Sequence, residues 1–148
     1  MELESLYQEV ILDHYKHPAN KKLSPDYTAQ VHHVNTSCGD EITLNLSLKD
    51  GLITQVSWEG VGCSISQAST SIMTDLMIGK DTESALSVLG EFTSLMQSKG
   101  LAKGDELVLE DAVALAGVSK FPARIKCALL GWMAFKDAIS QSVTQQEK

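Results

Sequence analysis

The stretch TSCGDEITLNLSLKDGLITQVSWEGVGCSIS (residues 36–66) decides the fold, because it predicts a long antiparallel hairpin. Its first half alternates strictly between polar residues and four apolar ones, Ile42, Leu44, Leu46 and Leu48. A period of two is typical of a strand with one buried face. The second half, residues 52–59, carries on one parity the apolar residues Leu52, Val56 and Trp58. Asp50 and Gly51 between the halves form the two-residue connection that antiparallel strands favour.

The open end of this hairpin carries two cysteines. Counting outward from a loop at residues 50 and 51 puts Cys38 opposite Cys63, with Cα atoms roughly 4.5–5.5 Å apart if the pairing extends that far. Glycines flank both cysteines, and glycine within a strand pattern marks a bulge, a bend or a close backbone approach. We therefore expect the two cysteines to be neighbours even where regular pairing ends.

Length and charge limit the class of protein. With 148 residues, the chain is expected to form one domain over residues 1–148. A net charge of −7 without a basic block argues against binding to nucleic acid. The first residues lack the layout of a signal peptide, and no apolar run approaches the ~20 residues of a membrane span. We therefore expect a soluble, cytoplasmic protein that has no membrane partner.

Helical patterns flank the hairpin on both sides. Before it, an amphipathic helix over residues 3–15 is stopped by Pro18, and a loop then leads to a weakly patterned strand over residues 28–35. After Cys63 the apolar period changes from 2 to 3.6, which predicts a helix with an apolar stripe over residues 65–77. Cys63 therefore lies at or just before a helix N-terminus, where unpaired N–H groups favour a thiolate.

Two further long helices are expected in the second half of the chain. The first, capped by Asp81 or Thr82, carries five apolar residues on its buried face, Leu86, Leu89, Phe92, Leu95 and Met96. A short helix over residues 110–116 follows. The last long helix opens with Ser119 as its cap and Pro122 in its first turn. Its buried stripe consists of Ile125, Leu129, Trp132, Phe135 and Ile139.

Four residues form a candidate metal site. Cys38 and Asp40 share a parity at the open end of the hairpin, near Cys63, and Cys127 in the last helix is the only further cysteine. Three thiolates and one carboxylate make a closed four-coordinate set that suits zinc and that iron also accepts. An odd number of cysteines argues against a disulfide framework and favours metal or thiol chemistry.

The residues alone leave alternatives open. Cys38 and Cys63 could form a cross-strand disulfide or simply pack, with Cys127 in the core and Asp40 as a turn residue. The sequence does not decide whether the last helix brings Cys127 to the hairpin. Arg124 shares a helix face with Cys127 and is a candidate functional residue. Three histidines have no partner at ligand spacing and are expected to bind no metal: His14, His32 and His33.

Four motifs carry a resemblance to a known family. They are LYQEVILDHYKHPAN (6–20), SCGDEITL (37–44), GVGCSISQAS (60–69) and FPARIKCALL (121–130). They resemble the SufU proteins, a branch of the IscU and NifU N-terminal family of iron–sulfur cluster assembly proteins, over nearly the whole chain. The resemblance implies an α+β domain of the SufE/NifU-like kind, with a three-stranded antiparallel sheet, helices packed on one face and a metal site at one end. The family's metal ligands fall on Cys38, Asp40, Cys63 and Cys127.

The resemblance also implies a role in sulfur transfer. A cysteine desulfurase of the SufS type would form a persulfide and pass its outer sulfur to Cys38, while Asp40 holds a zinc ion. Arg124 would steady the carboxylate or the thiolates, and a cluster scaffold complex of the SufBCD type would receive the sulfur. The sequence leaves open whether such a carrier counts as an enzyme. If it does, it is a zinc-dependent sulfurtransferase that acts with a cysteine desulfurase.

Departures from the scaffold branch separate this interpretation from its rivals. Where that branch has a histidine directly before its last cysteine, this chain has Lys126, and where it has a chaperone-recognition motif LPPVK, this chain reads FPARI (121–125). The stretch between Cys63 and Cys127 is also longer, as in the SufU branch. These differences favour a zinc-bound sulfur carrier over a scaffold on which a [2Fe–2S] cluster is assembled. A third alternative is a binding module in which zinc is purely structural.

Overall fold

A computed structural model describes residues 2–146, and the side chains from residue 7 to residue 144. Leu3 and Leu6, which belong to the predicted stripe of the first helix, have side chains outside this range. The elements in chain order are α1 (Glu2–Lys16), β1 (Ala29–Asn35), β2 (Asp40–Lys49), β3 (Leu52–Val61), α2 (Ser64–Met77), α3 (Thr82–Met96), α4 (Glu106–Leu109), the 3₁₀ helix η1 (Glu110–Lys120) and α5 (Pro122–Gln146).

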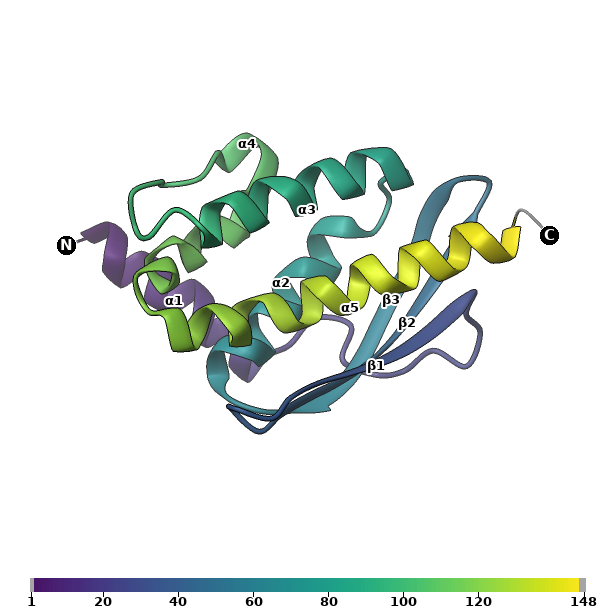
Figure 1. Cartoon of the computed structure of the whole chain (residues 1–148), viewed down its shortest axis with the longest axis horizontal. Helices are drawn as coiled ribbons and strands as arrows, with labels where there is room; N and C mark the ends of the chain where they lie inside the picture. Colours follow the sequence, from purple (N-terminus) through teal and green to yellow (C-terminus); the bar gives the residue numbers. More distant parts are fainter. Residues whose placement is uncertain (1, 147–148) are drawn as a thin grey trace.

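The three strands form one antiparallel sheet in the order β1-β2-β3, and helices cover one of its faces. The long helix α5 runs across β1 and β2, and α2 lies beside it against β3 (Figure 1). The chain before β1 crosses the other face, where the Ser24 backbone N–H donates to Ser57 Oγ (2.9 Å) and Asn45 Nδ2 donates to the Ser24 carbonyl oxygen (2.9 Å). The predicted α+β architecture is confirmed.

The hairpin turn is as predicted, but the register beyond it is not. Asp50 (φ 53°) and Gly51 (φ 78°) both have positive φ, as a type I′ turn requires. Leu48 pairs with Ile53 as counted, but Ser47 pairs with Gln55, because a bulge at Thr54 inserts one extra residue into β3.

The bulge changes which residues face the core. Ile53 is fully buried where the alternation predicted Leu52, which is 48% exposed, whereas Val56 and Trp58 are buried as predicted. The ladder ends at the pair Glu41 and Val61, so Cys38 and Cys63 lie just beyond it rather than in a paired position.

The two helices that carry Cys63 and Cys127 pack closely together. Trp132 Nε1 on α5 donates to Ser69 Oγ on α2 (2.9 Å), and the Ser69 hydroxyl donates to the Ala128 carbonyl oxygen (2.6 Å). A side chain at Gly131 would collide with Thr70 of α2, so glycine permits this approach. The Trp132 ring also stacks on Phe92, with centroids 3.9 Å apart. These contacts fix α2 against α5.

The helices follow the predicted order, with differences at their ends and faces. The first helix ends at Lys16, before Pro18, and Asp81 caps α3 by accepting from the Ser84 N–H (2.7 Å). On α3, Leu86 is exposed rather than buried, and Ala85 and Val88 face the core instead.

The start of α5 corrects a second prediction. Ser119 is not its cap, because this residue lies inside η1 and its hydroxyl donates to the Ala116 carbonyl oxygen (2.7 Å). The predicted short helix over residues 110–116 is this 3₁₀ helix, preceded by the single turn α4. Among the helices described, none combines the length and the apolar character needed to cross a bilayer.

Candidate metal centre

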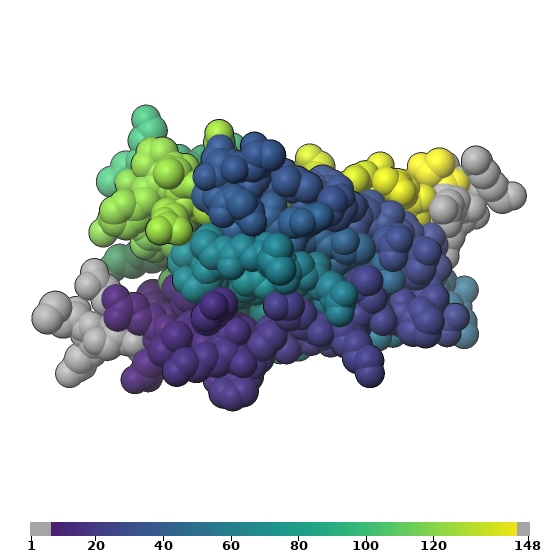
Figure 2. All heavy atoms as spheres, turned by 90° about the horizontal axis from the view of Figure 1, so that it is seen from below, coloured from purple at the N-terminus to yellow at the C-terminus, as the bar shows by residue number. Residues whose placement is uncertain are grey.

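The candidate site lies where three separate segments meet at one end of the molecule. Cys38 lies in the turn between β1 and β2, and Asp40 is the first residue of β2. Cys63 is the N-cap residue of α2, and Cys127 lies near the start of α5. Figure 1 shows these three segments at the same end, and in the space-filling view they adjoin on one face (Figure 2).

Three of the four predicted ligands converge on one point. The sulfurs of Cys38 and Cys127 and a carboxylate oxygen of Asp40 all lie within 4.8 Å of one another. The Cys63 sulfur is not part of this set, but Cys63 adjoins it. Its backbone N–H donates to Asp40 Oδ1 (2.8 Å), and its side chain helps to raise the pKa of the Cys127 thiol. All three cysteines are free thiols, so the alternative disulfide between Cys38 and Cys63 is not formed.

The Asp40 carboxylate has one satisfied oxygen and one orphaned oxygen. Asp40 is fully buried; its Oδ1 accepts from the Cys63 N–H, but its Oδ2 has no hydrogen-bond partner among the described residues. A buried carboxylate oxygen without a partner is costly unless a positive charge or a donor lies beside it. A bound cation would supply that partner, so the orphaned oxygen fits a metal ligand.

Gly62 makes room for this carboxylate. Its φ of 152° lies in the region that favours glycine, and a Cβ at this position would collide with the Asp40 carboxylate and crowd the Ser66 hydroxyl. The glycine before Cys63 therefore has a definite role, which the sequence pattern indicated only as a close backbone approach.

The environment of Cys127 favours the protonated thiol when no metal is bound. Burial raises the pKa of the Cys127 thiol, and its contacts with the side chains of Cys38, Cys63 and Asp40 raise it further. Cys38 and Cys127 both point toward the Ala123 carbonyl oxygen in the first turn of α5, at 3.9 and 3.8 Å. Because a metal binds the thiolate, binding would release protons from these groups. The two converging sulfurs and the carboxylate oxygen, with Cys63 adjoining as a fourth donor, make a set that fits zinc.

The start of α5 is held against β1 beside the site. Asn35 Nδ2 at the end of β1 donates to Cys127 Sγ (4.0 Å), a contact that the sequence analysis missed. Further along, His33 Nε2 lies 2.9 Å from Asp137 Oδ2, and this hydrogen bond lowers the pKa of the Asp137 carboxyl. The only available signal for Asn35 was its place three residues before Cys38.

Other predicted residues lie outside the cluster. Arg124 is exposed, and its side chain makes no hydrogen bond or ion pair with any described residue. The structure therefore does not bring it to Asp40 or the thiols, and its role stays a prediction. The three histidines contact residues outside the cluster: His14 contacts Ser71 and Asp111, His32 contacts Glu41, and His33 contacts Asp137.

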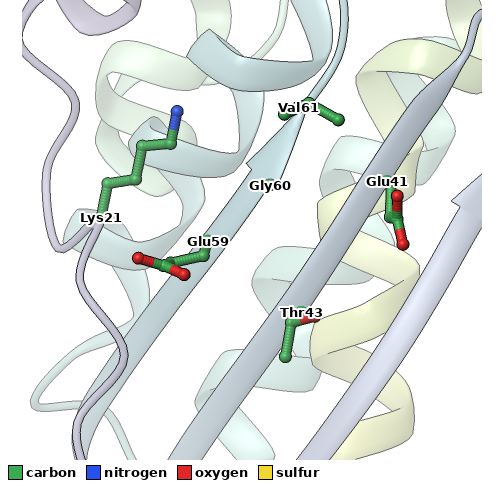
Figure 3. Close-up of a pocket in the computed structure, with 6 residues that line it drawn as sticks. All are labelled: Lys21, Glu41, Thr43, Glu59, Gly60 and Val61. Atoms are coloured by element: carbon green, nitrogen blue, oxygen red, sulfur yellow. The ribbon is translucent and has the colours of Figure 1, made fainter.

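A shallow groove of about 440 Å³ lies over β2 and β3 (Figure 3). It is lined by Lys21, Glu41, Thr43, Glu59, Gly60 and Val61. Glu41 directly follows Asp40 in the chain, and Val61 directly precedes Gly62. The groove therefore borders the candidate metal centre. Val61, which lines the groove, is an exposed apolar residue.

Comparisons with known proteins agree with this architecture. Residues 6–145 match the family described as NifU-like N terminal domain. The "Zinc-dependent sulfurtransferase SufU" of Bacillus subtilis is 46% identical over 139 residues, which cover 94% of this chain and 92% of that protein. The "Iron-sulfur cluster assembly scaffold protein IscU" of Streptococcus pyogenes is 40% identical, with 97% of this chain and 89% of that protein covered.

Solved structures give the same result. A putative iron-sulfur cluster assembly scaffold protein for the SUF system from Fervidobacterium islandicum superposes with a TM-score of 0.82 at 34% identity, covering 90% of this chain and 96% of that one. The N-terminal part of a NifU-like protein from Brucella abortus has a TM-score of 0.83 at 22% identity, covering 97% of this chain and 99% of that one. That second similarity concerns the fold alone.

Proposed function

Because this chain belongs to the NifU-like N-terminal domain family, we propose that it is an iron–sulfur cluster assembly protein that accepts sulfur from the persulfide of a cysteine desulfurase. The observation that carries the proposal is the convergence of the Cys38 and Cys127 sulfurs on the orphaned carboxylate of Asp40, with Cys63 adjoining. We assign the metal-binding role to these four residues and zinc as the metal.

Cys38 is the proposed sulfur acceptor, because it is less buried than Cys127 and its backbone is less constrained than that of Cys63. Cys127 is fully buried in a long helix. Cys63 is the N-cap of α2, where its N–H donates to Asp40 Oδ1 and its carbonyl oxygen accepts from the Gln67 N–H (3.2 Å). Cys38 is only partly buried and lies in a short turn beside Gly39, whose φ is 66°. A turn residue moves at lower cost than a residue inside a packed helix.

The transfer step needs no oxidant or reductant. The Cys38 thiolate attacks the outer sulfur of the partner's persulfide, and a new S–S bond forms between them. The S–S bond within the partner breaks, and the partner's cysteine leaves as a thiolate. When bound, zinc would keep the thiols deprotonated near neutral pH. Asp40, anchored by the Cys63 N–H, keeps its place while Cys38 moves.

The proposal extends to partners and to Arg124. We infer a donor of the SufS type, a downstream complex of the SufBCD type and a cytoplasmic location. The name of the Bacillus relative supports the sulfurtransferase role. Arg124 lies one helical turn before Cys127, so steadying the thiolates would require its exposed side chain to fold back along α5.

Metal analysis of the purified protein, combined with desulfurase turnover, tests the proposal. We expect about one zinc per chain and a marked stimulation of a SufS-type desulfurase, which Cys38→Ala abolishes without unfolding the protein. If Cys38→Ala stimulates the desulfurase as strongly as the wild type does, Cys38 is not the acceptor.

A cluster scaffold is the second candidate, favoured by the IscU name of the Streptococcus relative and by the ability of the same ligands to bind iron. Anaerobic reconstitution with iron and sulfide separates the two functions. A stable coloured cluster that transfers to an apo-ferredoxin would favour the scaffold, whereas a colourless zinc protein that stimulates the desulfurase favours the carrier.

A further inference from the structure

Asn35 connects the turn that carries Cys38 to the helix that carries Cys127. It is the last residue of β1 and pairs with Asp40, so both side chains point to the face on which α5 packs. Its backbone carbonyl oxygen accepts from the Cys38 N–H (3.3 Å), and its side-chain Nδ2 donates to Cys127 Sγ (4.0 Å). One residue therefore contacts both the proposed acceptor and the buried thiol.

The orientation of the Asn35 amide follows from its contacts. The Ser37 backbone N–H donates to Oδ1 (3.3 Å), and an N–H group can only be matched by the oxygen of the amide. The NH₂ group must then face Cys127, so the sulfur receives an N–H donor rather than an oxygen lone pair. Such a donor stabilises a thiolate more than a thiol, because the negative sulfur is the better acceptor.

This contact distinguishes Cys127 from the other two cysteines. Among the described residues, no side-chain N–H other than that of Asn35 donates to the sulfur of Cys38, Cys63 or Cys127. Cys38 Sγ points toward an acceptor, the Ala123 carbonyl oxygen (3.9 Å), and receives no side-chain N–H among the described residues. The site is therefore asymmetric: one thiol is buried and held by a donor, and another is partly exposed and not held.

We propose that Asn35 is a positioning residue for sulfur transfer, whose amide N–H holds the Cys127 thiolate in the site so that Cys38 is the thiolate released to the partner. This inference rests on the proposed function. It adds a residue outside the four ligands that determines which sulfur reacts. Partners of metal ligands commonly contribute 10–100-fold to metal affinity.

The variant Asn35→Ser tests the proposal, because it separates the donor from the turn. A serine hydroxyl still accepts from the backbone N–H two residues later, but it is too short to reach Cys127. Zinc-loaded wild type and variant are treated with iodoacetamide, and mass spectrometry follows the alkylation of each cysteine, with Cys63 as internal reference. In the wild type Cys38 reacts first and Cys127 last. In Asn35→Ser the rate ratio of Cys127 to Cys38 rises about tenfold or more, and zinc affinity falls about 10–100-fold.

If the ratio of the Cys127 and Cys38 alkylation rates is unchanged in Asn35→Ser, the proposal is wrong, even if zinc affinity falls. Asn35 would then only stabilise the turn. If Asn35→Ser does not fold, the nearly isosteric Asn35→Asp replaces it, because its carboxylate keeps the Ser37 contact and cannot donate at neutral pH. Gln30→Ala removes an amide from the same strand that bonds Asn45 instead, and it should leave the ratio unchanged. This assay contains no desulfurase. If the wild-type protein failed to stimulate a desulfurase, the proposed function would be wrong, but the role of Asn35 would still be decided by the alkylation rates.

Discussion

The backbone N–H of Cys63 donates a 2.8 Å hydrogen bond to Oδ1 of Asp40, while Oδ2 of the same carboxylate has no partner among the described residues. The bond joins the start of α2 to the start of β2 and holds the carboxylate beside the sulfurs of Cys38 and Cys127. Asp40 therefore has one oxygen that accepts from a backbone N–H and one that is free for the proposed metal.

Two substitutions of Asp40 separate these roles. Asp40→Asn keeps an oxygen for the Cys63 N–H but loses the negative charge, so we expect weaker zinc binding with a metal-free stability near that of the wild type. Asp40→Ala also leaves the buried N–H without a partner, which costs about 1–3 kcal/mol of unfolding free energy. Chelator competition and denaturant unfolding measure the two effects. If the Asp40→Asn variant has lost its zinc but still stimulates the desulfurase as the wild type does, the metal is purely structural.

Arg124 and Lys126 form a matched pair on α5. Both are exposed cations, but only Arg124 lies one turn from Cys127. If Arg124 steadies the thiolates, Arg124→Ala should lower the rate of sulfur acceptance several-fold, whereas Lys126→Ala should have little effect. The rate is measured by single-turnover transfer from a persulfidated desulfurase. Equal losses in both variants would indicate general electrostatic attraction of the partner instead.

Gly62 should tolerate no side chain. A Cβ there would collide with the Asp40 carboxylate, and the φ of 152° is unfavourable for other residues. Gly62→Ala is therefore expected to displace Asp40 and to weaken zinc binding by at least about tenfold. Gly90→Ala is the control, because a Cβ in that helical position meets no atom within 4 Å. It should keep zinc affinity and stabilise α3 by about 0.5–1 kcal/mol.

The elements could be predicted from the sequence because their signals are local. Each signal depends on residues only a few positions apart. This holds for the alternation over β2, the turn at Asp50 and Gly51, and the helical stripe after Cys63. The bulge at Thr54 has no such signal, since one extra residue leaves the composition of the strand unchanged. The error it caused was a shift by one residue, which exchanges the two faces of a strand.

The convergence of the site could not be derived from spacing alone. Cys127 reaches the hairpin because Ser69 and Gly131 let α5 pack closely on α2, a contact between segments far apart in the chain. Counting along the hairpin predicted that Cys38 and Cys63 are neighbours, but only the family resemblance indicated that Cys127 joins them. The contact between Asn35 and Cys127 has the same origin, so no local pattern could reveal it.

Because of the bulge, the burial of residues 52 and 53 is the reverse of what a simple alternation predicts. Ile53 is fully buried and Leu52 is 48% exposed. Ile53→Ala should therefore destabilise the protein by about 2–5 kcal/mol, the usual cost of truncating a buried aliphatic side chain. Leu52→Ala should cost less than about 1 kcal/mol. Denaturant unfolding of the metal-free proteins compares them, and a larger loss for Leu52→Ala would show that the strand is paired without the bulge.

Stability should depend on pH with opposite sign in the metal-free and zinc-loaded proteins. Burial raises the pKa of the Cys127 thiol above its ordinary value of 9.0. Above pH 9 the unfolded chain loses this proton while the folded metal-free protein keeps it, so its stability falls as pH rises. The slope approaches about 1.4 kcal/mol per pH unit for one proton, and Cys127→Ala should lack this contribution. Zinc needs the thiolates, so its affinity should instead increase with pH. Denaturant unfolding between pH 7 and about pH 10.5, with and without zinc, measures both trends; equal slopes for wild type and Cys127→Ala would contradict the assignment to this thiol.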